Sequence, residues 1–141
     1  MEDILLLNLK KQKEFSALLE NIKSKRSPLL ANGLLTVQRA HMAYFLKENL
    51  NKKIVIVTPN EIEGEKLYED LSFYTKGRAL FLKNEEIRFY SIEAKDRKEE
   101  TRRINTLITL ASNDYDILVL SVETAMRRYI PKEVYLHSIF N

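Results

Sequence analysis

Two uninterrupted aliphatic runs constrain the fold more than any other feature of this sequence. Residues 54–57 are Ile-Val-Ile-Val and residues 117–120 are Ile-Leu-Val-Leu, with no polar residue inside either run. A strand with one solvent-facing side alternates apolar and polar residues, whereas a strand covered on both faces does not. The two runs therefore predict buried strands of a parallel sheet, and each parallel pairing needs a crossover, usually a helix.

Helical segments lie between these strands. Apolar residues recur at helical spacing in residues 10–23, 36–50 and 95–111. Asn60 with Glu63 resembles a capping box that starts a further helix, and Ser121 is placed to cap a helix over residues 122–129. Residues 28–31 and 79–82 predict two more short strands. We predict an α/β fold with a doubly wound, mostly parallel sheet and helices on both faces.

The length of 141 residues and the 45% hydrophobic content are sufficient for one domain with a real core. We expect an N-terminal helical segment at residues 1–27 and the α/β domain at residues 28–130. Residues 131–141 are expected to begin a following domain, with a strand starting at 133–136, so that the chain is a fragment of a longer protein.

The composition argues against disulfide-stabilised, membrane-spanning and strongly basic nucleic-acid-binding proteins. The chain has no cysteine, which excludes disulfides and thiolate metal sites and favours the reducing cytoplasm. Its apolar runs are too short to span a bilayer and no signal peptide is present, so we expect no membrane partner. A net charge of +3 permits nucleic-acid contact but does not indicate a dedicated basic surface. Residues 95–103 mix both signs, as solvated helix faces do.

Residues 28–40 have the layout of a phosphate-binding loop, with an apolar segment, a glycine and the start of a helix. The pattern of such loops is G-x-x-x-x-G-K-[ST]. If Gly33 is the first glycine, Gln38, Arg39 and Ala40 occupy the last three positions. Gln38 resists the positive φ that glycine adopts at little cost, Arg39 is wider than lysine, and Ala40 has no oxygen for magnesium. Thr36 has a hydroxyl but lies too early in the loop.

The metal-binding acid of a nucleotide hydrolase is also missing from its usual place. The strand at 117–120 is followed by Ser121 and Val122, and Glu123 comes only later on a predicted helix. We therefore interpret the loop as the remnant of a phosphate site, without ATP hydrolysis.

Other polar residues indicate no catalytic chemistry. His41 is predicted to be a half-buried structural residue, because no nucleophile lies at a suitable spacing, and the distant His137 does not complete a metal site. The acidic residues of the helix after residue 60 are predicted to be solvated positions opposite its apolar face. They are Glu61, Glu63, Glu65, Glu69 and Asp70.

Four stretches of the chain occur in a recognisable order: NGLLTVQRA, KKIVIVTPNEIEGEKLYEDLSFY, FYSIEAKDRKEETRRINTLITL and DYDILVLSVETAMRRYIPKE. Together they resemble the N-terminal UvrB-like module of the bacterial transcription-repair coupling factors, over about residues 28–133. No single motif among them is sharp, and the resemblance depends on their joint order and spacing.

The resemblance implies a P-loop NTPase or helicase-like fold similar to UvrB domain 1a, with a lost ATP site. The whole protein would be an ATP-dependent translocase on double-stranded DNA that displaces stalled RNA polymerase and recruits UvrA. ATP and magnesium would bind only in its C-terminal motor, and no cofactor is expected in this chain. UvrA would contact mainly the following domain. The dozen residues after residue 82 are too few for the DNA-clamping hairpin of UvrB.

Five residues are candidates for contact with a partner or DNA. Phe89 and Tyr90 lie in a predicted irregular segment, where contact residues are common. Arg103 follows them at a spacing that the resemblance includes, and Arg127 with Arg128 could contact phosphate or simply form a cationic helix end. Two other functions stay open. One is a helicase-type NTPase half-domain that uses Arg39 in an atypical loop, and the other is a module that binds the DNA backbone.

Overall fold

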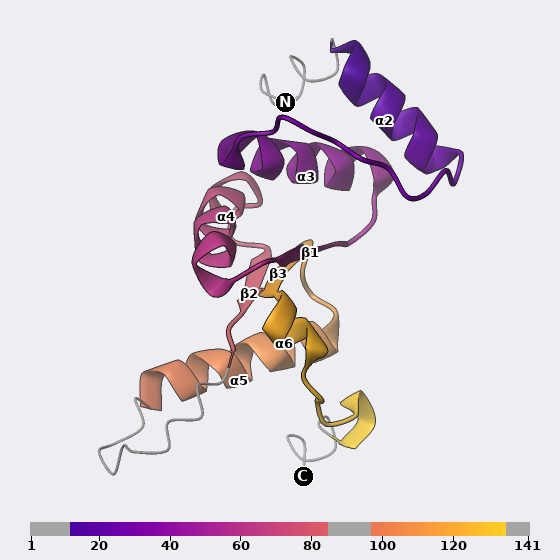
Figure 1. The fold of residues 1–141 in the computed structure, drawn as a ribbon. Coiled ribbons are helices and arrows are strands. Elements are labelled where there is room, and N and C mark those ends of the chain that lie inside the picture. The colour runs from indigo at the N-terminus through magenta and orange to yellow at the C-terminus, as the bar shows by residue number, and fades with distance from the viewer. Residues whose placement is uncertain (1–11, 85–96, 135–141) are drawn as a thin grey trace.

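A computed structural model describes residues 12–84 and 97–134 of the chain (Figure 1). Its strands form one parallel sheet in the order β1-β3-β2. The elements are α2 (Lys13–Lys23), α3 (Thr36–Leu50), β1 (Ile54–Thr58), α4 (Glu61–Tyr74), β2 (Ala79–Leu82), α5 (Arg97–Ser112), β3 (Ile117–Ser121) and α6 (Val122–Met126).

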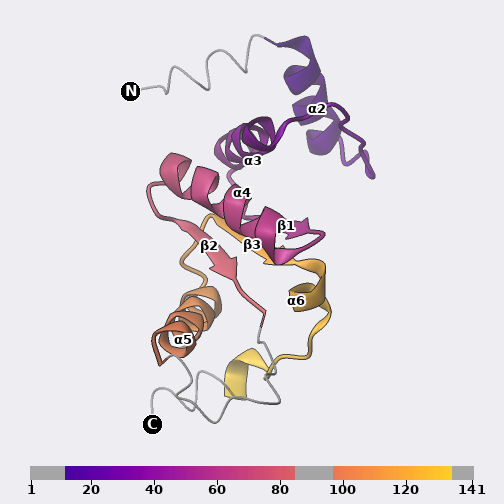
Figure 2. The same cartoon turned by 60° about the vertical axis from the view of Figure 1, so that its left-hand side comes forward.

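Helices flank the sheet on both faces, which confirms the predicted α/β class. Helix α4 connects β1 to β2 past the central strand, and α5 connects β2 back to β3. Because the chain crosses the sheet in opposite directions in these two connections, right-handed crossovers place the two helices on opposite faces. Figures 1 and 2 show α3 and α4 together on one side of the sheet and α5 on the other.

The central strand β3 is buried on both faces, as its aliphatic run predicts. Its alternate side chains enter two hydrophobic cores, because successive residues of a strand point to opposite faces. The core under α3 and α4 contains Ala40, Ala43, Leu67, Leu71, Ala79, Ile117 and Val119. The core under α5 contains Leu82, Leu118 and Leu120, with Leu80, Leu107, Leu110 and Tyr115 packed against it.

The prediction that residues 54–57 are covered on both faces is wrong. Val55 and Val57 are 57% and 53% exposed, while Ile54 and Ile56 pack against the core under α3 and α4. The cause is the strand order, which places β1 at an edge of the sheet while α5 packs on β2 and β3.

The predicted strand at residues 28–31 is also wrong. This segment has no strand pairing, and Leu29 and Leu30 are 40% and 86% exposed. Leu29 and Ala31 border a groove between α2 and α3. A strand forms only where a neighbouring strand accepts and donates its backbone hydrogen bonds, and residues 28–31 have no such neighbour. Within the described residues the sheet therefore has three strands, where the sequence predicts four.

The predicted helix starts are confirmed by their hydrogen bonds. The Asn60 side chain accepts from the backbone N–H of Glu63 at 2.9 Å, and the Ser121 hydroxyl accepts from the N–H of Thr124 at 3.2 Å. The helix after Ser121 is shorter than predicted and ends at Met126.

After α6 the chain leaves the helical conformation. Arg127 has an extended backbone, with φ −72° and ψ 152°. The Tyr129 hydroxyl then donates to the carbonyl oxygen of Thr124 at 2.9 Å. Residues 132–134 are helical, so the strand predicted at 133–136 is wrong where the structure describes it. The rest of that prediction lies outside the described residues.

Candidate functional site

The loop before α3 (residues 32–35) lies at the carboxyl edge of the sheet, where α/β proteins place their ligands. Near the start of α3, Arg39 Nη1 is 4.0 Å from a carboxylate oxygen of Glu63 in the first turn of α4. At the other end of α3, Lys47 Nζ is 3.0 Å from Asp116, which immediately precedes β3. Helices α3 and α4 therefore run in the same direction and begin together at the carboxyl edge.

Gly33 adopts a left-handed backbone conformation in this loop. Its φ is +79°, and among the described residues no heavy atom beyond its two chain neighbours lies within 4 Å of the place where a Cβ would be. The positive φ favours glycine there. Leu35, which follows in the same loop, is 71% exposed, so this part of the chain is solvated and apolar.

Gln38 folds back onto the start of its own helix. Its side-chain oxygen accepts a hydrogen bond from the backbone N–H of Leu35 at 2.9 Å. Leu35 is the N-cap of α3 and has no side-chain acceptor. Gln38 thus supplies the glutamine half of a capping box and satisfies a backbone donor at the helix start.

Arg39 and Ala40 also make contacts within the fold. Arg39 Nε donates to the carbonyl oxygen of Leu34 at 3.3 Å, and its guanidinium approaches Glu63. The Arg39 side chain remains 56% exposed, so this ion pair adds little stability. Ala40 is completely buried in the core. Thr36 is the first residue of α3 and is exposed.

Carboxylates surround the carboxyl edge. Glu61 accepts from the backbone N–H of Asn84, and Glu123 accepts from the Asn84 side-chain amide at 3.1 Å. Because Glu61 and Glu63 lie in the first turn of α4 and Glu123 in that of α6, they complement the helix dipoles. A phosphate brought to this edge would therefore meet fixed negative charge.

Sequence reasoning predicted the role of Glu63 at the helix start with Asn60 but missed the role of Glu61. Glu61 is half-buried and hydrogen-bonded, which differs from the predicted solvated position. Glu63 is exposed as predicted and contributes to the helix start with Asn60, at 3.5 Å between the two side chains. The position of Glu61 in the first turn of α4 could have indicated an interaction with the helix dipole. Its hydrogen bond with Asn84 could not be predicted, because Asn84 is 23 residues away in the sequence.

The other predicted residues are scattered. Arg103 is half-buried on α5, whereas Arg127 and Arg128 follow α6, outside the helix. Phe89 and Tyr90 lie outside the described residues. The structure therefore brings the loop candidates together at the start of α3. The contact candidates Arg103, Arg127 and Arg128 lie on or after other helices.

His41 has the structural environment that its position predicts. It is half-buried on α3, and its ring centroid lies 4.5 Å from that of Tyr74. Tyr44 stacks on the same tyrosine at 5.8 Å. These rings hold α3 against α4. His137 lies outside the described residues.

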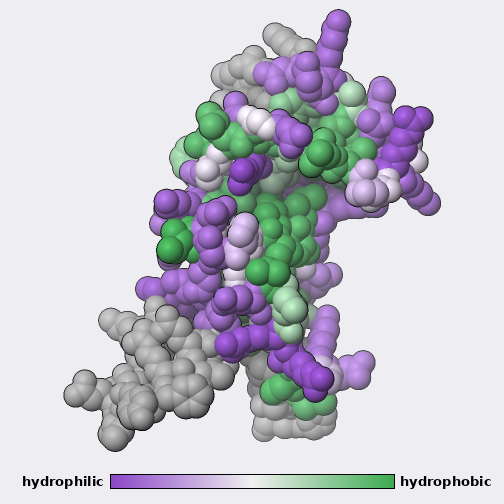
Figure 3. All heavy atoms as spheres, viewed as in Figure 1, coloured by the Kyte–Doolittle hydropathy of each residue, from purple (hydrophilic) through white to green (hydrophobic). Residues whose placement is uncertain are grey.

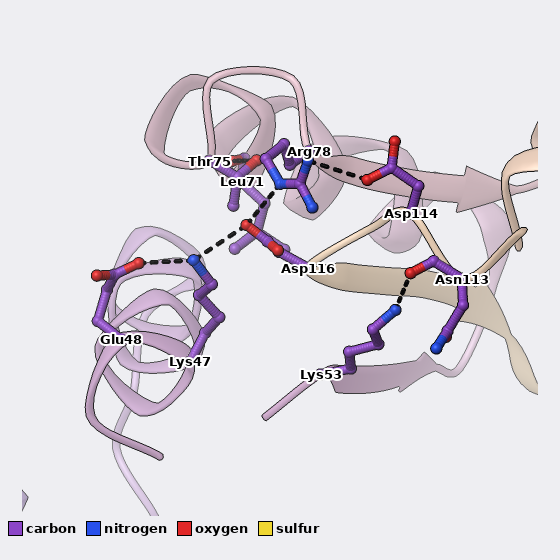
Figure 4. A network of polar contacts seen from close by, with 9 residues as sticks. All are labelled: Lys47, Glu48, Lys53, Leu71, Thr75, Arg78, Asn113, Asp114 and Asp116. Carbon is purple, nitrogen blue, oxygen red and sulfur yellow. Dashed lines mark hydrogen bonds and ion pairs between the residues drawn. The ribbon is translucent and has the colours of Figure 1, made fainter. Parts of the chain in front are cut away.

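A second polar cluster lies at the opposite, amino edge of the sheet (Figure 4). Asp116 Oδ2 is 3.0 Å from Lys47 Nζ and 3.1 Å from Arg78 Nε. Arg78 also pairs with Asp114 at 3.1 Å, and Lys47 with Glu48 at 2.7 Å. Asp116 therefore joins α3 to the turn before β2. The sequence patterns do not predict this cluster, because its members are distant from one another in the chain.

Burial and ion pairing have opposite effects on the Asp116 carboxyl. Partial desolvation raises its pKa, but the hydrogen bonds and charges of Lys47 and Arg78 outweigh that effect and leave the pKa below its ordinary value. The pKa of Lys47 is raised in turn, because hydrogen bonds and charge from Glu48 and Asp116 outweigh its own desolvation. The ion pair of Asp116 with Lys47 is therefore favoured at neutral pH, and it joins α3 to the sheet.

Comparisons with known proteins give no relative: no family model matches the chain, and no curated protein or solved structure does. No helix within residues 12–84 or 97–134 has the length and apolar composition needed to cross a bilayer. Across the same described ranges, no group of three or more His, Cys, Asp or Glu side chains is arranged to hold a metal ion.

Proposed function

We propose that this chain is a non-catalytic interaction module with a degenerate phosphate loop. In this proposal it is a doubly wound, P-loop-like domain similar to UvrB domain 1a, at the N-terminus of a transcription-coupled DNA repair factor. It serves as a scaffold for the domain that recruits UvrA. The parent protein would work in the cytoplasm on double-stranded DNA and RNA polymerase, with its ATP-dependent motor elsewhere.

One observation carries the non-catalytic part of this proposal. The side chains at the three positions that would bind a triphosphate make other contacts within the fold. Gln38 caps its own helix, Arg39 contacts the loop carbonyl of Leu34 and the carboxylate of Glu63, and Ala40 is completely buried. Phosphate binding would need lysine and magnesium together at this point.

The acidic carboxyl edge supports the same interpretation. Strand β3 ends in Ser121, which is 1% exposed and caps α6, in the place where a metal-binding acid would stand. Glu123 is held by Asn84 instead. The scaffold role and the partners rest on the sequence resemblance alone.

Isothermal titration with Mg-ATP tests the proposal. We expect no binding heat with the natural chain at ligand concentrations up to the millimolar range. The matched control is Glu63→Gln, which keeps the oxygen that can hydrogen-bond with Asn60 but removes the charge 4.0 Å from Arg39. That variant should bind no better. Micromolar binding by either protein would overturn the claim of a degenerate site.

A nucleotide-binding half-domain that uses Arg39 is the second candidate. The observation that favours it is the position of Arg39 at the carboxyl edge with a side chain 56% exposed. ATP hydrolysis by the natural chain that is abolished in Arg39→Ala would establish this function and refute the scaffold proposal. Absence of hydrolysis in both proteins would exclude it.

A further inference from the structure

A groove separates α2 from α3, and the residues that the structure describes cover it only in part. Its volume is about 350 Å³, which falls at the lower end of the range for small-molecule pockets. Figure 1 shows α2 at one end of the molecule, beyond α3 and away from the sheet. The apolar lining comes from α2, the following loop and α3, and consists of Leu18, Ile22, Leu29, Ala31, Met42 and Leu46.

Within residues 12–84 and 97–134, other side chains cover the apolar face of α2 only in part. None of its residues is fully buried, although Leu18 and Ile22 lie on its apolar side. Its ring contact with α3 joins Phe15 to Phe45, with centroids 5.7 Å apart. An amphipathic helix gains most of its stability by burying its apolar face, and here that face is half open. Figure 3 shows hydrophobic side chains at the surface in this region, among polar ones.

We propose that residues 2–7 of the same chain occupy this groove. The segment reads Glu-Asp-Ile-Leu-Leu-Leu, two acids followed by four aliphatic residues. The groove has the complementary composition, because Lys25 and Arg26 line it beside the apolar side chains. The aliphatic residues would fill the groove, and the acids would lie at the cationic end.

The length of chain before α2 permits this contact. Nine peptide units separate Asp3 from Gln12, which immediately precedes α2, and an extended chain covers up to about 30 Å over that number. From the start of α2 to Lys25 the helical rise amounts to only about 18 Å. The segment can therefore turn back along α2 and bring its acids to Lys25 and Arg26 without full extension.

The segment also fits the groove better than a separate partner would. A tethered segment has an effective concentration in the millimolar range, so modest apolar contact suffices for occupancy. A second copy of the chain could supply the same residues in trans, and the experiment separates the two cases by isotope labelling.

Nuclear Overhauser contacts in the full chain test the proposal. We expect cross-peaks between methyl groups of Leu5–Leu7 and the Met42 methyl group, unchanged on dilution. In a mixed sample of labelled and unlabelled chains, filtered experiments should show no contact between chains. Leu5→Asp with Leu6→Asp should abolish the cross-peaks and shift the Met42 resonance. Missing cross-peaks in the natural chain, or contacts found only between chains, would overturn the proposal.

Charge reversal provides an independent arm. Lys25→Glu with Arg26→Glu should weaken the cross-peaks at least severalfold, and adding Glu2→Lys with Asp3→Lys should restore them. Lys13→Glu is the matched control, because this exposed residue starts α2 and does not line the groove. Equal loss in the control, or no restoration by the second pair, would refute the assigned charge contacts.

Discussion

Replacement of Gly64 by alanine should destabilise this protein, although the same change stabilises most helices. Alanine exceeds glycine in helix propensity by about 1 kcal/mol, which predicts a gain at this position near the start of α4. A Cβ at Gly64, however, would lie 2.9 Å from Phe81 Cε2 and 2.9 Å from Thr58 Oγ1. The sign of the change in free energy of unfolding therefore depends on whether these neighbours can move.

The surroundings hold both neighbours in place. Phe81 stacks on Tyr68 with ring centroids 5.7 Å apart. Thr58 is 7% exposed, and its hydroxyl donates to the carbonyl oxygen of Asn60 at 2.8 Å. Overpacking a core costs about 1–3 kcal/mol. After subtraction of the propensity gain, we expect a net loss of about 0–2 kcal/mol in the free energy of unfolding.

Urea denaturation followed by circular dichroism measures this loss. Glu69→Ala is the matched control, an exposed position on the same helix, and should change the free energy by less than about 0.5 kcal/mol. In a Phe81→Leu background the cost of Gly64→Ala should shrink by at least ~0.5 kcal/mol, since contacting residues couple. Stabilisation of the natural chain by Gly64→Ala would refute the close packing of α4 on β1 and β2.

Two further perturbations test the ion pairs of Asp116 and the helix cap at Asn60. Asp116→Asn should cost about 1–2 kcal/mol at pH 7, since it removes the charge that Lys47 and Arg78 share. Because the folded pKa of Asp116 is lowered, its contribution is full above the unfolded value of about 3.9 and disappears as the pH falls through the folded value. Denaturation curves of both proteins should therefore converge in acid, and a constant difference down to pH 2 would contradict this assignment. Asn60→Ala should cost about 1 kcal/mol, because it removes the acceptor for the Glu63 N–H, whereas Asn60→Ser should retain most of the stability. Equal losses in thermal unfolding for both Asn60 variants would exclude a capping role.

Local sequence patterns predicted most elements of this fold. The helix at Thr36–Leu50 and the strand at Ala79–Leu82 have the predicted bounds. The caps at Asn60 and Ser121 also form as their spacing indicates. These features depend on hydrogen bonds and periodicity within a few residues, so the information for them is contained in short stretches.

The candidate site was predictable only in outline. The replacement of phosphate-loop residues by Gln38, Arg39 and Ala40 is visible in the sequence. That Arg39 would lie beside Glu63, and that Asn84 would join two acidic helix starts, depends on contacts across 23 or more residues. No periodicity encodes such contacts, because they follow from how the helices are placed around the sheet.

The amino-acid sequence alone determined where the longer helices lie, where most of them begin, and that the central strand is buried on both faces. Only the tertiary structure decided that β1 is an edge strand with two exposed valines and that residues 28–31 stay outside the sheet. Both outcomes have the same physical reason. An apolar run indicates that a segment has apolar surface to bury. Which segment packs against it depends on the tertiary arrangement of the whole chain, so the run alone does not determine its neighbour.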